Sequence, residues 1–580
     1  LHSMQYLLYP VVIYALLVVV SYIITFLQLC KVRLQYPNYQ IQTVENIPAY
    51  LQKLFLIPIQ ELQEFGFKSC CYLRVKPILK VYPDVAWEIL LYNEACNCYA
   101  KVGIRHPIEP VHLFDIEFYT FFKDKTCLVT TNGKGNAVIG KIPFFIMQDY
   151  YTAETSLQWQ FHQDRFAKLR SKKIPKLLSP EALTEALQIY FQYYLNTLIK
   201  SKYILPVPRK RLFSLNRRLA LKLTQKNINE NNKSAGVIKQ RREEAKSNSK
   251  LSIEIPIELE VEGFQRMEIL QRGLIDRKIR PWLILGSFVL FVITSTNYFG
   301  TQSLIIFIAV LMLHEGGHLL AMKICGYQDC SLLFLPFLGA VATARKDDAT
   351  ITQKFCVSLA GPMPGLIIGL VLAIIFKDAG YSSWIKQTSW ILICLKLFNL
   401  LPIYPLDGGQ IVNILLFSRF PYSDVLLKAF GAIIISILGI AHPALFLLTI
   451  PLAFNLVNSY RAAQINSKLQ KSFRKNPPQN QDKINQENII YSIFKYLKEF
   501  DYHHLPFNSR YFLVKNLIER YNCFYSKRIT KVILASVYSV SLFAGIFVSW
   551  QTIVPSSVDL IPKFAKSFPN YIHIQEQIQK

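Results

Sequence analysis

The chain has 580 residues and a formal net charge of +27, and hydrophobic residues make up 52% of it. Its mean hydropathy is +0.24, which is too high for an ordinary soluble protein of this length. Long uncharged runs beside strongly basic segments indicate an integral membrane protein with basic parts in water.

Eight apolar segments are candidate membrane spans, since a spanning helix needs about 20 apolar residues. They cover residues 6–29, 281–296, 304–324, 355–376, 390–401, 426–440, 443–457 and 532–548. The first segment lacks a basic start and a small-residue cleavage site, so we predict an anchor (1–30) and not a cleaved signal peptide. The expected fold class is a predominantly α-helical, multi-pass membrane protein with about eight spans.

The basic residues are concentrated in residues 31–280 and 458–531. The positive-inside rule places both parts in the cytoplasm, and eight crossings then put the tail (554–580) outside. Basic flanks beside spanning helices normally face anionic lipid, so we expect a lipid partner here. A nucleic-acid partner is not expected, although the basic residues 168–250 keep open an alternative in which this soluble part binds nucleic acid or a lipid surface.

The cytoplasmic part is predicted to begin with a basic α+β domain (31–224). Within it, FDIEFYTFFKDKTCLVTTNG (114–133) predicts two strands around a charged turn, and residues 150–222 are more helical. The polar residues 225–250, rich in Asn, Lys and Ser, predict a disordered linker. In the juxtamembrane segment that follows (251–280), the alternation in 252–264 predicts a short strand.

The membrane core (281–460) is followed by a basic helical cytoplasmic segment (461–530) and a final span (531–553). The 11 cysteines are odd in number and lack zinc-ribbon spacing. They include the clusters Cys70–Cys71 and Cys96/Cys98, and we predict reduced thiols and no disulfide framework.

Three ionisable residues stand close together in an otherwise apolar stretch, in the motif HEGGH (314–318). On a helix His314 and His318 lie on one face, where two imidazoles can bind one zinc ion. Glu315 lies beside them and can act as the general base of hydrolysis. Ionisable groups in a bilayer are costly and tend to serve function, so the alternative of two hydrogen-bonded core histidines is disfavoured. The glycine pair leaves room for close backbone approach.

A catalytic zinc usually has three protein ligands and one open position. The segment NLLPIYPLDGGQIVNILL (399–416) contains one acid, Asp407, between two prolines and a Gly-Gly pair. Pro402 and Pro405 predict a helix break, which is tolerated at membrane depth only where protein or water covers it. Asp407 is therefore the candidate third ligand. Asp347 and Asp348 are rivals, but they lie in the charged stretch RKDD, which is typical of a solvated loop.

Taken together, HEGGH (314–318), SLAGPMPG (358–365) and NLLPIYPLDGG (399–409) resemble the three motifs of the site-2 protease family. These are intramembrane zinc metalloproteases of peptidase family M50, and the resemblance covers roughly residues 281–460. It implies that His314, His318 and Asp407 bind one zinc ion per chain and that Glu315 is the general base and acid. It also implies a role for Asn399 in substrate positioning or oxyanion stabilisation.

The sequence departs from the family pattern AGP-x-x-N at one position, where Gly365 stands in place of Asn. In the family, the place of LLFLPFLGAVATA (332–344) holds a strand-like segment that can pair with an unwound substrate. The long N-terminal cytoplasmic part resembles larger bacterial relatives, which implies a bacterial inner membrane.

The function expected from these observations is zinc-dependent cleavage of a peptide bond within or near a transmembrane helix of a protein substrate, as regulated proteolysis. One alternative is another class of membrane metalloprotease with a glutamate as third ligand, against which the LDGG motif argues. A second is a non-catalytic, zinc-binding scaffold or transporter-like protein. Glu315 discriminates against the second, because a structural zinc site has no need of that carboxylate.

Overall fold

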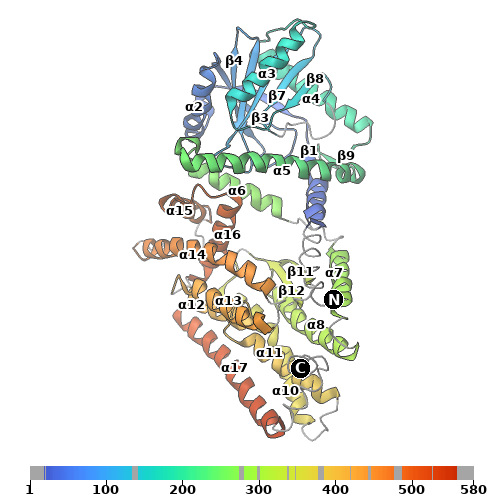
Figure 1. Cartoon of the computed structure of the whole chain (residues 1–580), viewed down its shortest axis with the longest axis vertical. Helices are drawn as coiled ribbons and strands as arrows, with labels where there is room; N and C mark the ends of the chain where they lie inside the picture. The colour runs from blue at the N-terminus through green and yellow to red at the C-terminus, as the bar shows by residue number, and fades with distance from the viewer. Residues whose placement is uncertain are drawn as a thin grey trace, which may run out of the picture. The chain divides into compact units, whose positions relative to one another are not determined.

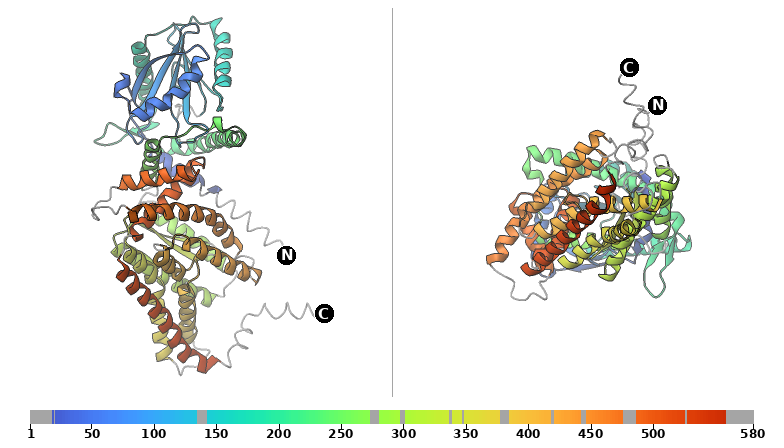
Figure 2. Two further views of the ribbon diagram at one scale, coloured as in Figure 1. Left: turned by 90° about the vertical axis from the view of Figure 1, so that its left-hand side faces the viewer. Right: turned by 90° about the horizontal axis from the view of Figure 1, so that it is seen from below.

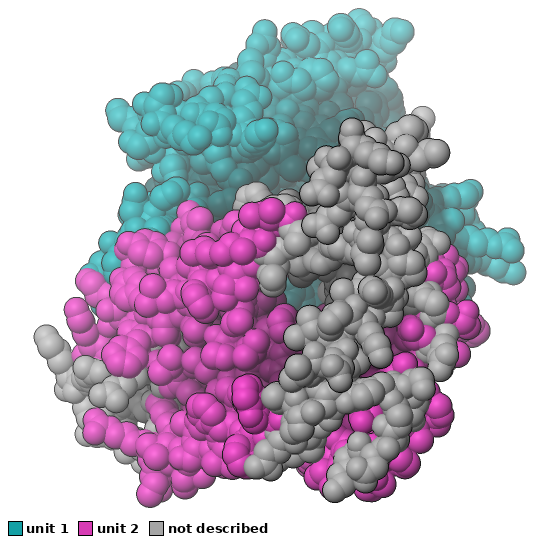
Figure 3. Space-filling view, turned by 60° about the horizontal axis from the view of Figure 1, so that its bottom comes forward, with its two compact units in different colours: residues 1–274, 486–511 teal, residues 275–485, 512–580 magenta. Residues whose placement is uncertain are grey.

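The computed structural model describes residues 18–19, 21–133, 142–272, 280–296, 301–335, 339–346, 348–376, 384–417, 420–441, 446–475, 486–524 and 527–557. It divides into two compact units, which Figure 3 colours separately. Unit 1 contains residues 1–274 and 486–511, and unit 2 contains residues 275–485 and 512–580. The residues of the predicted cytoplasmic segment 461–530 divide between the two units.

Unit 1 is built on a seven-stranded sheet of order β2-β3-β4-β5-β6-β7-β8, seen in Figure 1. Its strands are β2 (Asn38–Gln42), β3 (Lys68–Lys76), β4 (Ala86–Asn93), β5 (Cys98–Ile104), β6 (Phe114–Phe121), β7 (Cys127–Thr131) and β8 (Phe145–Asp149). Neighbours are antiparallel except β7 and β8, which are parallel. The predicted pair of strands in 114–133 is confirmed as β6 and β7, and unit 1 has the predicted mixture of helix and sheet.

Helices lie on both sides of this sheet (Figure 2). Adjacent residues of a strand point to opposite faces, and β6 illustrates the consequence. Phe118 packs against Trp159, with ring centroids 5.0 Å apart, whereas Tyr119 joins a core cluster with Leu187 on the other side. The helices concerned are α2 (Ala49–Gln63), α3 (Thr155–Arg170) and α4 (Pro180–Lys200). The sheet thus has a hydrophobic core on each face.

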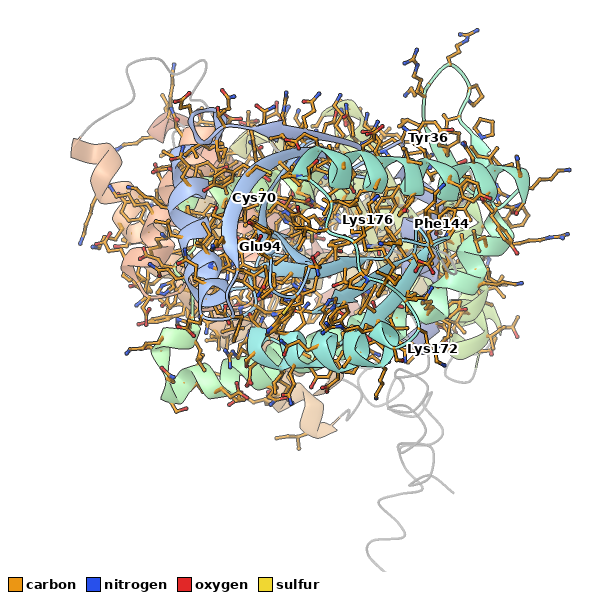
Figure 4. All side chains as sticks on the ribbon, turned by 90° about the horizontal axis from the view of Figure 1, so that it is seen from above. Tyr36, Cys70, Glu94, Phe144, Lys172 and Lys176 are labelled. Atoms are coloured by element: carbon orange, nitrogen blue, oxygen red, sulfur yellow. The ribbon has the colours of Figure 1, made fainter. Side chains whose placement is uncertain are left out.

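The cysteines whose side chains the structure describes are free thiols. Cys70 and Cys71 lie on β3, where the register with β4 shifts by one residue. Figure 4 labels Cys70, whose side chain is exposed. Cys98 begins β5 and is buried.

The predicted disordered linker 225–250 is wrong, because these residues belong almost entirely to one helix, α5 (Arg217–Ser247). Asn216 caps its first turn, and Leu219 and Leu223 bury its start in the core of unit 1. Further along, oppositely charged side chains three or four residues apart support the exposed part: Lys226–Glu230, Arg241–Glu244 and Lys246–Glu243. The polar composition of residues 225–250 predicts disorder, but the stretch contains no proline and one glycine, so it can continue a helix.

The strand predicted within 252–264 is also wrong, because α6 (Ile257–Gln271) occupies most of that stretch. Within unit 1, α6 packs against α15 (Gln486–Glu499) and the first turn of α16 (Phe507–Phe524). Arg510 is fully buried there and lies 3.0 Å from the carboxylate of Glu260. A small three-stranded sheet of order β1-β10-β9 completes unit 1. Its strands are β1 (Arg33–Leu34), β9 (Ile204–Pro206) and β10 (Phe213–Leu215).

Unit 2 is helical apart from one hairpin, β11 (Gln328–Leu335) and β12 (Gly339–Arg345), in the part that the structure describes. Its helices are α7 (Arg280–Ser295), α8 (Thr301–Ile324), α9 (Ile351–Ala360), α10 (Pro362–Ile375), α11 (Trp384–Leu400), α12 (Asp407–Phe417), α13 (Ser423–Ala441), α14 (Phe446–Lys475) and α17 (Arg528–Ser557). The hairpin confirms the strand-like character expected of residues 332–344. One core cluster joins α9, α10, α12 and α17, and a second joins α7 to the hairpin.

The prediction of eight spans is not confirmed. Over the described ranges, two helical stretches are long and apolar enough to cross a membrane, Ser303–Ile324 and Arg528–Phe547. A third crossing is counted if α9 and α10, bent by 40° at their junction, form one span. Part of the difference lies in the interruptions: Pro362 starts a new helix after Gly361, and α7 has 16 residues. Most of the predicted anchor 1–30 lies outside the described residues.

Candidate metal centre

Two imidazoles project from one face of α8. His314 and His318 are one turn apart, with ring centroids 4.8 Å apart and ring planes at 83°. Both residues are buried, at 7% and 8% exposure. The surrounding sequence is apolar and free of proline, so the helix continues through the motif as predicted.

The carboxylate of Asp407, at the start of α12, lies close to these imidazoles. The helix break predicted at Pro402 and Pro405 is confirmed, because α11 ends at Leu400 and α12 begins at Asp407. Asp407 is 9% exposed. Its two carboxylate oxygens lie 3.2 Å from Nε2 of His314 and 3.5 Å from Nε2 of His318. Ligand atoms of the three residues all lie within 4.8 Å of one another.

The donor atoms fit a metal cation. Nδ1 of His318 lies 2.7 Å from the carbonyl oxygen of Val357, a contact that requires a proton on Nδ1. In the neutral ring, Nε2 then presents a lone pair toward a carboxylate oxygen, an arrangement that a cation between the two acceptors would make favourable. Nδ1 of His314 is buried without a hydrogen-bond partner. Two imidazole nitrogens and a carboxylate are ligands that zinc commonly takes.

Close helix packing explains one glycine of HEGGH. A Cβ on Gly317 would lie 2.1 Å from the carbonyl oxygen of Ala360, whereas one on Gly316 would meet nothing within 4 Å. A Cβ on Gly361 would lie 2.2 Å from Nε2 of His318. Gly317 and Gly361 therefore let the α9–α10 junction approach the imidazoles directly.

Glu315 is held beside this group by the hairpin. Its side chain is 5% exposed, and its Oε2 accepts a hydrogen bond of 2.8 Å from the backbone N–H of Ala342 on β12. This bond places the carboxylate against the backbone of β12. The structure thus brings His314, His318, Glu315 and Asp407 into one buried region.

The structure also describes two other sequence candidates. Asn399 is half-buried in the last turn of α11, eight residues before Asp407. Asp348 is exposed, and Asp347 lies outside the described residues. Sequence reasoning missed the carbonyl of Val357 and the amide of Ala342, because backbone groups carry no sequence signal. It also missed Lys396, which is 2% exposed on α11 and whose isolation in an apolar stretch was a usable signal.

The sequence of the region that holds His314 and His318 is similar to that of known zinc metalloproteases. Residues 302–381 match the model of peptidase family M50. A zinc metalloprotease of Methanocaldococcus jannaschii is 30% identical over 135 residues, which cover 23% of this chain and 39% of the relative. Stage IV sporulation protein FB of Bacillus subtilis is 22% identical over 122 residues, covering 21% of this chain and 42% of the relative. The chain thus matches about two fifths of the length of these relatives.

A solved structure, the site-2 protease from Methanocaldococcus jannaschii, aligns at 24% identity with a TM-score of 0.24. The alignment covers 31% of this chain and 88% of that chain. The family assignment rests on the sequence matches and not on this superposition. The segment that carries His314 and His318 is thus similar to peptidase family M50 and to named zinc metalloproteases.

Proposed function

We propose that this chain is a zinc-dependent endopeptidase that hydrolyses a peptide bond within or near a transmembrane helix of a protein substrate. The observation that carries the proposal is the buried convergence of His314, His318 and Asp407, with the carboxylate of Glu315 held beside them. The apolar helices of unit 2 and the M50 match support a place in the membrane.

Each side chain of the site has its own role in the proposed hydrolysis. His314, His318 and Asp407 would hold one zinc ion, which when bound supplies Lewis-acid chemistry to the hydrolysis of an amide. Val357 fixes the ring of His318 through its carbonyl oxygen, so that Nε2 is the free nitrogen. Glu315 takes the proton of the attacking water and returns it to the leaving amine. Asn399, at the end of α11, is proposed to position the substrate or stabilise its oxyanion.

The hairpin offers a place for the substrate backbone. In the described sheet β12 pairs with β11 alone, which leaves its outer edge unpaired there, and Glu315 accepts a hydrogen bond from the N–H of Ala342 on β12. A transmembrane helix hides its peptide bonds in its own hydrogen bonds, so it must unwind before cleavage. An unwound segment that pairs with the outer edge of β12 would regain those hydrogen bonds close to Glu315.

The membrane, the orientation of the chain and its lipid partner are proposed from the sequence alone. A bacterial inner membrane, with basic unit 1 on the cytoplasmic side against anionic lipid, agrees with the net charge of +27 and the positive-inside rule. The non-catalytic alternative, a zinc-binding scaffold or transporter-like protein, keeps the three ligands but has no use for Glu315. The deciding experiment therefore separates metal binding from cleavage.

That experiment measures zinc content and cleavage on the same detergent-purified proteins. Reconstituted transmembrane-helix reporters are the substrates, and His314→Ala, Asp407→Ala and Glu315→Gln are compared with wild type. We expect about one zinc per wild-type chain and loss of both zinc and cleavage in the two ligand variants. Glu315→Gln should keep zinc and lose cleavage. Asp348→Asn, an exposed carboxylate on the same unit, is the control and should change neither.

Two results would contradict the proposal. A wild-type protein that retains no zinc under metal-sparing conditions would sink the metalloprotease assignment. Full cleavage by Glu315→Gln would show that the carboxylate is not the proton-transfer group, and loss of zinc in His314→Ala alone would move the third ligand away from Asp407.

A further inference from the structure

A lysine ammonium is buried in unit 2, and among the described residues it has one hydrogen-bond acceptor, which is neutral. Lys396 on α11 is 2% exposed, and its Nζ lies 3.2 Å from the carbonyl oxygen of Val310. Val310 lies one turn before His314 on α8. An ammonium has three donors, and a single backbone carbonyl satisfies one of them. A charge inside the membrane region is costly unless another charge compensates it, so the position of Lys396 needs an electrostatic reason.

That reason lies at the metal centre. The contact with Val310 brings the Lys396 ammonium to the turn of α8 that precedes His314, within electrostatic reach of the carboxylates of Glu315 and Asp407. Lys428 on α13 shows the contrast. It lies 3.1 Å from the carboxylate of Asp424 and 2.8 Å from the hydroxyl of Ser459, so its charge is compensated locally.

A glycine on the neighbouring helix makes room for this lysine. A Cβ on Gly365 of α10 would lie 2.6 Å from Cε of Lys396, and 3.1 and 3.3 Å from Cγ and Cδ. Gly365 is the position where the sequence departs from the family pattern AGP-x-x-N. The side chain of Lys396 runs through the space that a larger residue at 365 would fill, and it reaches α8 from there.

The charges then balance in a particular way. With neutral imidazoles and ionised carboxyl groups, Glu315, Asp407 and Lys396 sum to one negative charge. A divalent metal turns this into one positive charge. The ammonium halves the negative charge that attracts the cation, and the positive excess left after the metal binds favours the negative charge that builds on the carbonyl oxygen of a substrate under attack.

We propose that Lys396 is a charge-balancing residue of the active site, whose ammonium weakens metal binding and stabilises the negative transition state. This inference rests on the proposed function, since it needs a metal at His314, His318 and Asp407. It differs from a packing role in the sign of its effect on metal affinity. A lysine that only tied α11 to α8 would help to shape the ligand set, and its loss would weaken metal binding.

The test measures the zinc dissociation constant of detergent-purified full-length protein by competition with a chelator at fixed pH, together with kcat and KM for a helix reporter. Lys396→Met removes the charge and the donor. Lys396→Gln removes the charge but keeps an N–H donor for Val310, and Lys396→Arg keeps the charge. Gly365→Ala displaces the ammonium without changing Lys396.

We expect the Met and Gln variants to bind zinc at least about tenfold more tightly, equivalent to about 1.4 kcal/mol, while kcat falls and KM changes little. The Arg variant should stay near wild type, and Gly365→Ala should shift zinc affinity in the direction of the Met variant. Unchanged or weaker zinc binding in both uncharged variants would overturn the inference while leaving the proposed function intact. A wild type without zinc would instead overturn the proposed function.

Discussion

The carboxylate of Glu315 on α8 and the backbone N–H of Ala342 on β12 form a hydrogen bond of 2.8 Å. This bond joins the candidate proton-transfer group to the strand edge at which a substrate could pair. Glu315 is thereby engaged by β12, while its neighbour His314 contacts Asp407. One helix can therefore supply two ligands and a separate base from five consecutive residues.

Ala342→Pro tests the importance of this bond, because proline has no N–H to donate. A hydrogen bond to a charged group contributes about 1.5–3 kcal/mol, so we expect kcat to fall by about tenfold or more. Zinc content should stay at the wild-type level, since the change removes a hydrogen bond to Glu315 and alters none of the three ligands. Ala342→Gly keeps the N–H and is the control. Equal kcat for the proline variant and wild type would mean that Glu315 needs no orientation by β12.

The two glycines of HEGGH provide a matched pair. Gly317→Ala would place Cβ 2.1 Å from the carbonyl oxygen of Ala360 and push α9 away from α8. Overpacking of this kind typically costs about 1–3 kcal/mol, so we expect a lower thermal transition and weaker zinc binding. Gly316→Ala meets nothing within 4 Å and should be neutral or stabilising, by up to about 1 kcal/mol from helix propensity. Similar melting curves for the two variants would contradict the packing at Ala360.

Features of the metal centre that depend on neighbouring residues in the chain can be predicted from the sequence, whereas features that depend on tertiary contacts cannot. The spacing of His314 and His318 alone places them on one face of a helix. The prolines before Asp407 predict the helix break that positions this residue. The partners of these residues depend on tertiary contacts, and two of them are backbone atoms, of Val357 and Ala342. Lys396 was visible in the sequence, but its acceptor and the glycine that makes room for it lie on other helices.

The prediction of eight spans is not confirmed and the prediction of a disordered linker at α5 is wrong, for different physical reasons. Apolar segments were counted as crossings, whereas the described core breaks its helices, as at Gly361–Pro362, and includes a hairpin. In α5, charge pairs at helical spacing and a capping Asn216 outweigh a polar composition. A classification of residues as polar or apolar predicts neither the helix breaks in the core nor the helix in residues 225–250.

Gly236 tests whether α5 is a helix in solution. It lies mid-helix, exposed, with nothing within 4 Å of an added Cβ. Gly236→Ala should stabilise the helix by about 1 kcal/mol and slow limited proteolysis within residues 225–250. Gly236→Pro should speed that proteolysis. If both variants were cut at the wild-type rate, residues 225–250 would behave as the disordered linker first predicted.

A buried histidine gives unit 1 a defined response to acid. His162 is 1% exposed, and its Nδ1 lies 2.7 Å from the hydroxyl of Thr130, with Nε2 3.0 Å from that of Thr120. Burial lowers the pKa of His162 from 6.5 to about 3. Below pH 6.5 the unfolded chain therefore binds a proton that the folded chain does not, and stability is lost as the pH falls from about 6.5 to about 3.

The expected loss from this group is about 1.4 kcal/mol per pH unit within that window, or roughly 2 kcal/mol at pH 5. His162→Gln removes the titrating group but keeps a side chain that can bond to the two threonines. The unfolding free energy of unit 1, followed by hydrogen exchange of the β6 and β7 amides between pH 7 and pH 5, should then fall less steeply than in wild type. His504→Gln, at a largely exposed histidine, should keep the wild-type slope. A wild-type slope in His162→Gln would assign the acid sensitivity to other groups, of which His106 and His112 are candidates because burial also lowers the pKa of each to about 3.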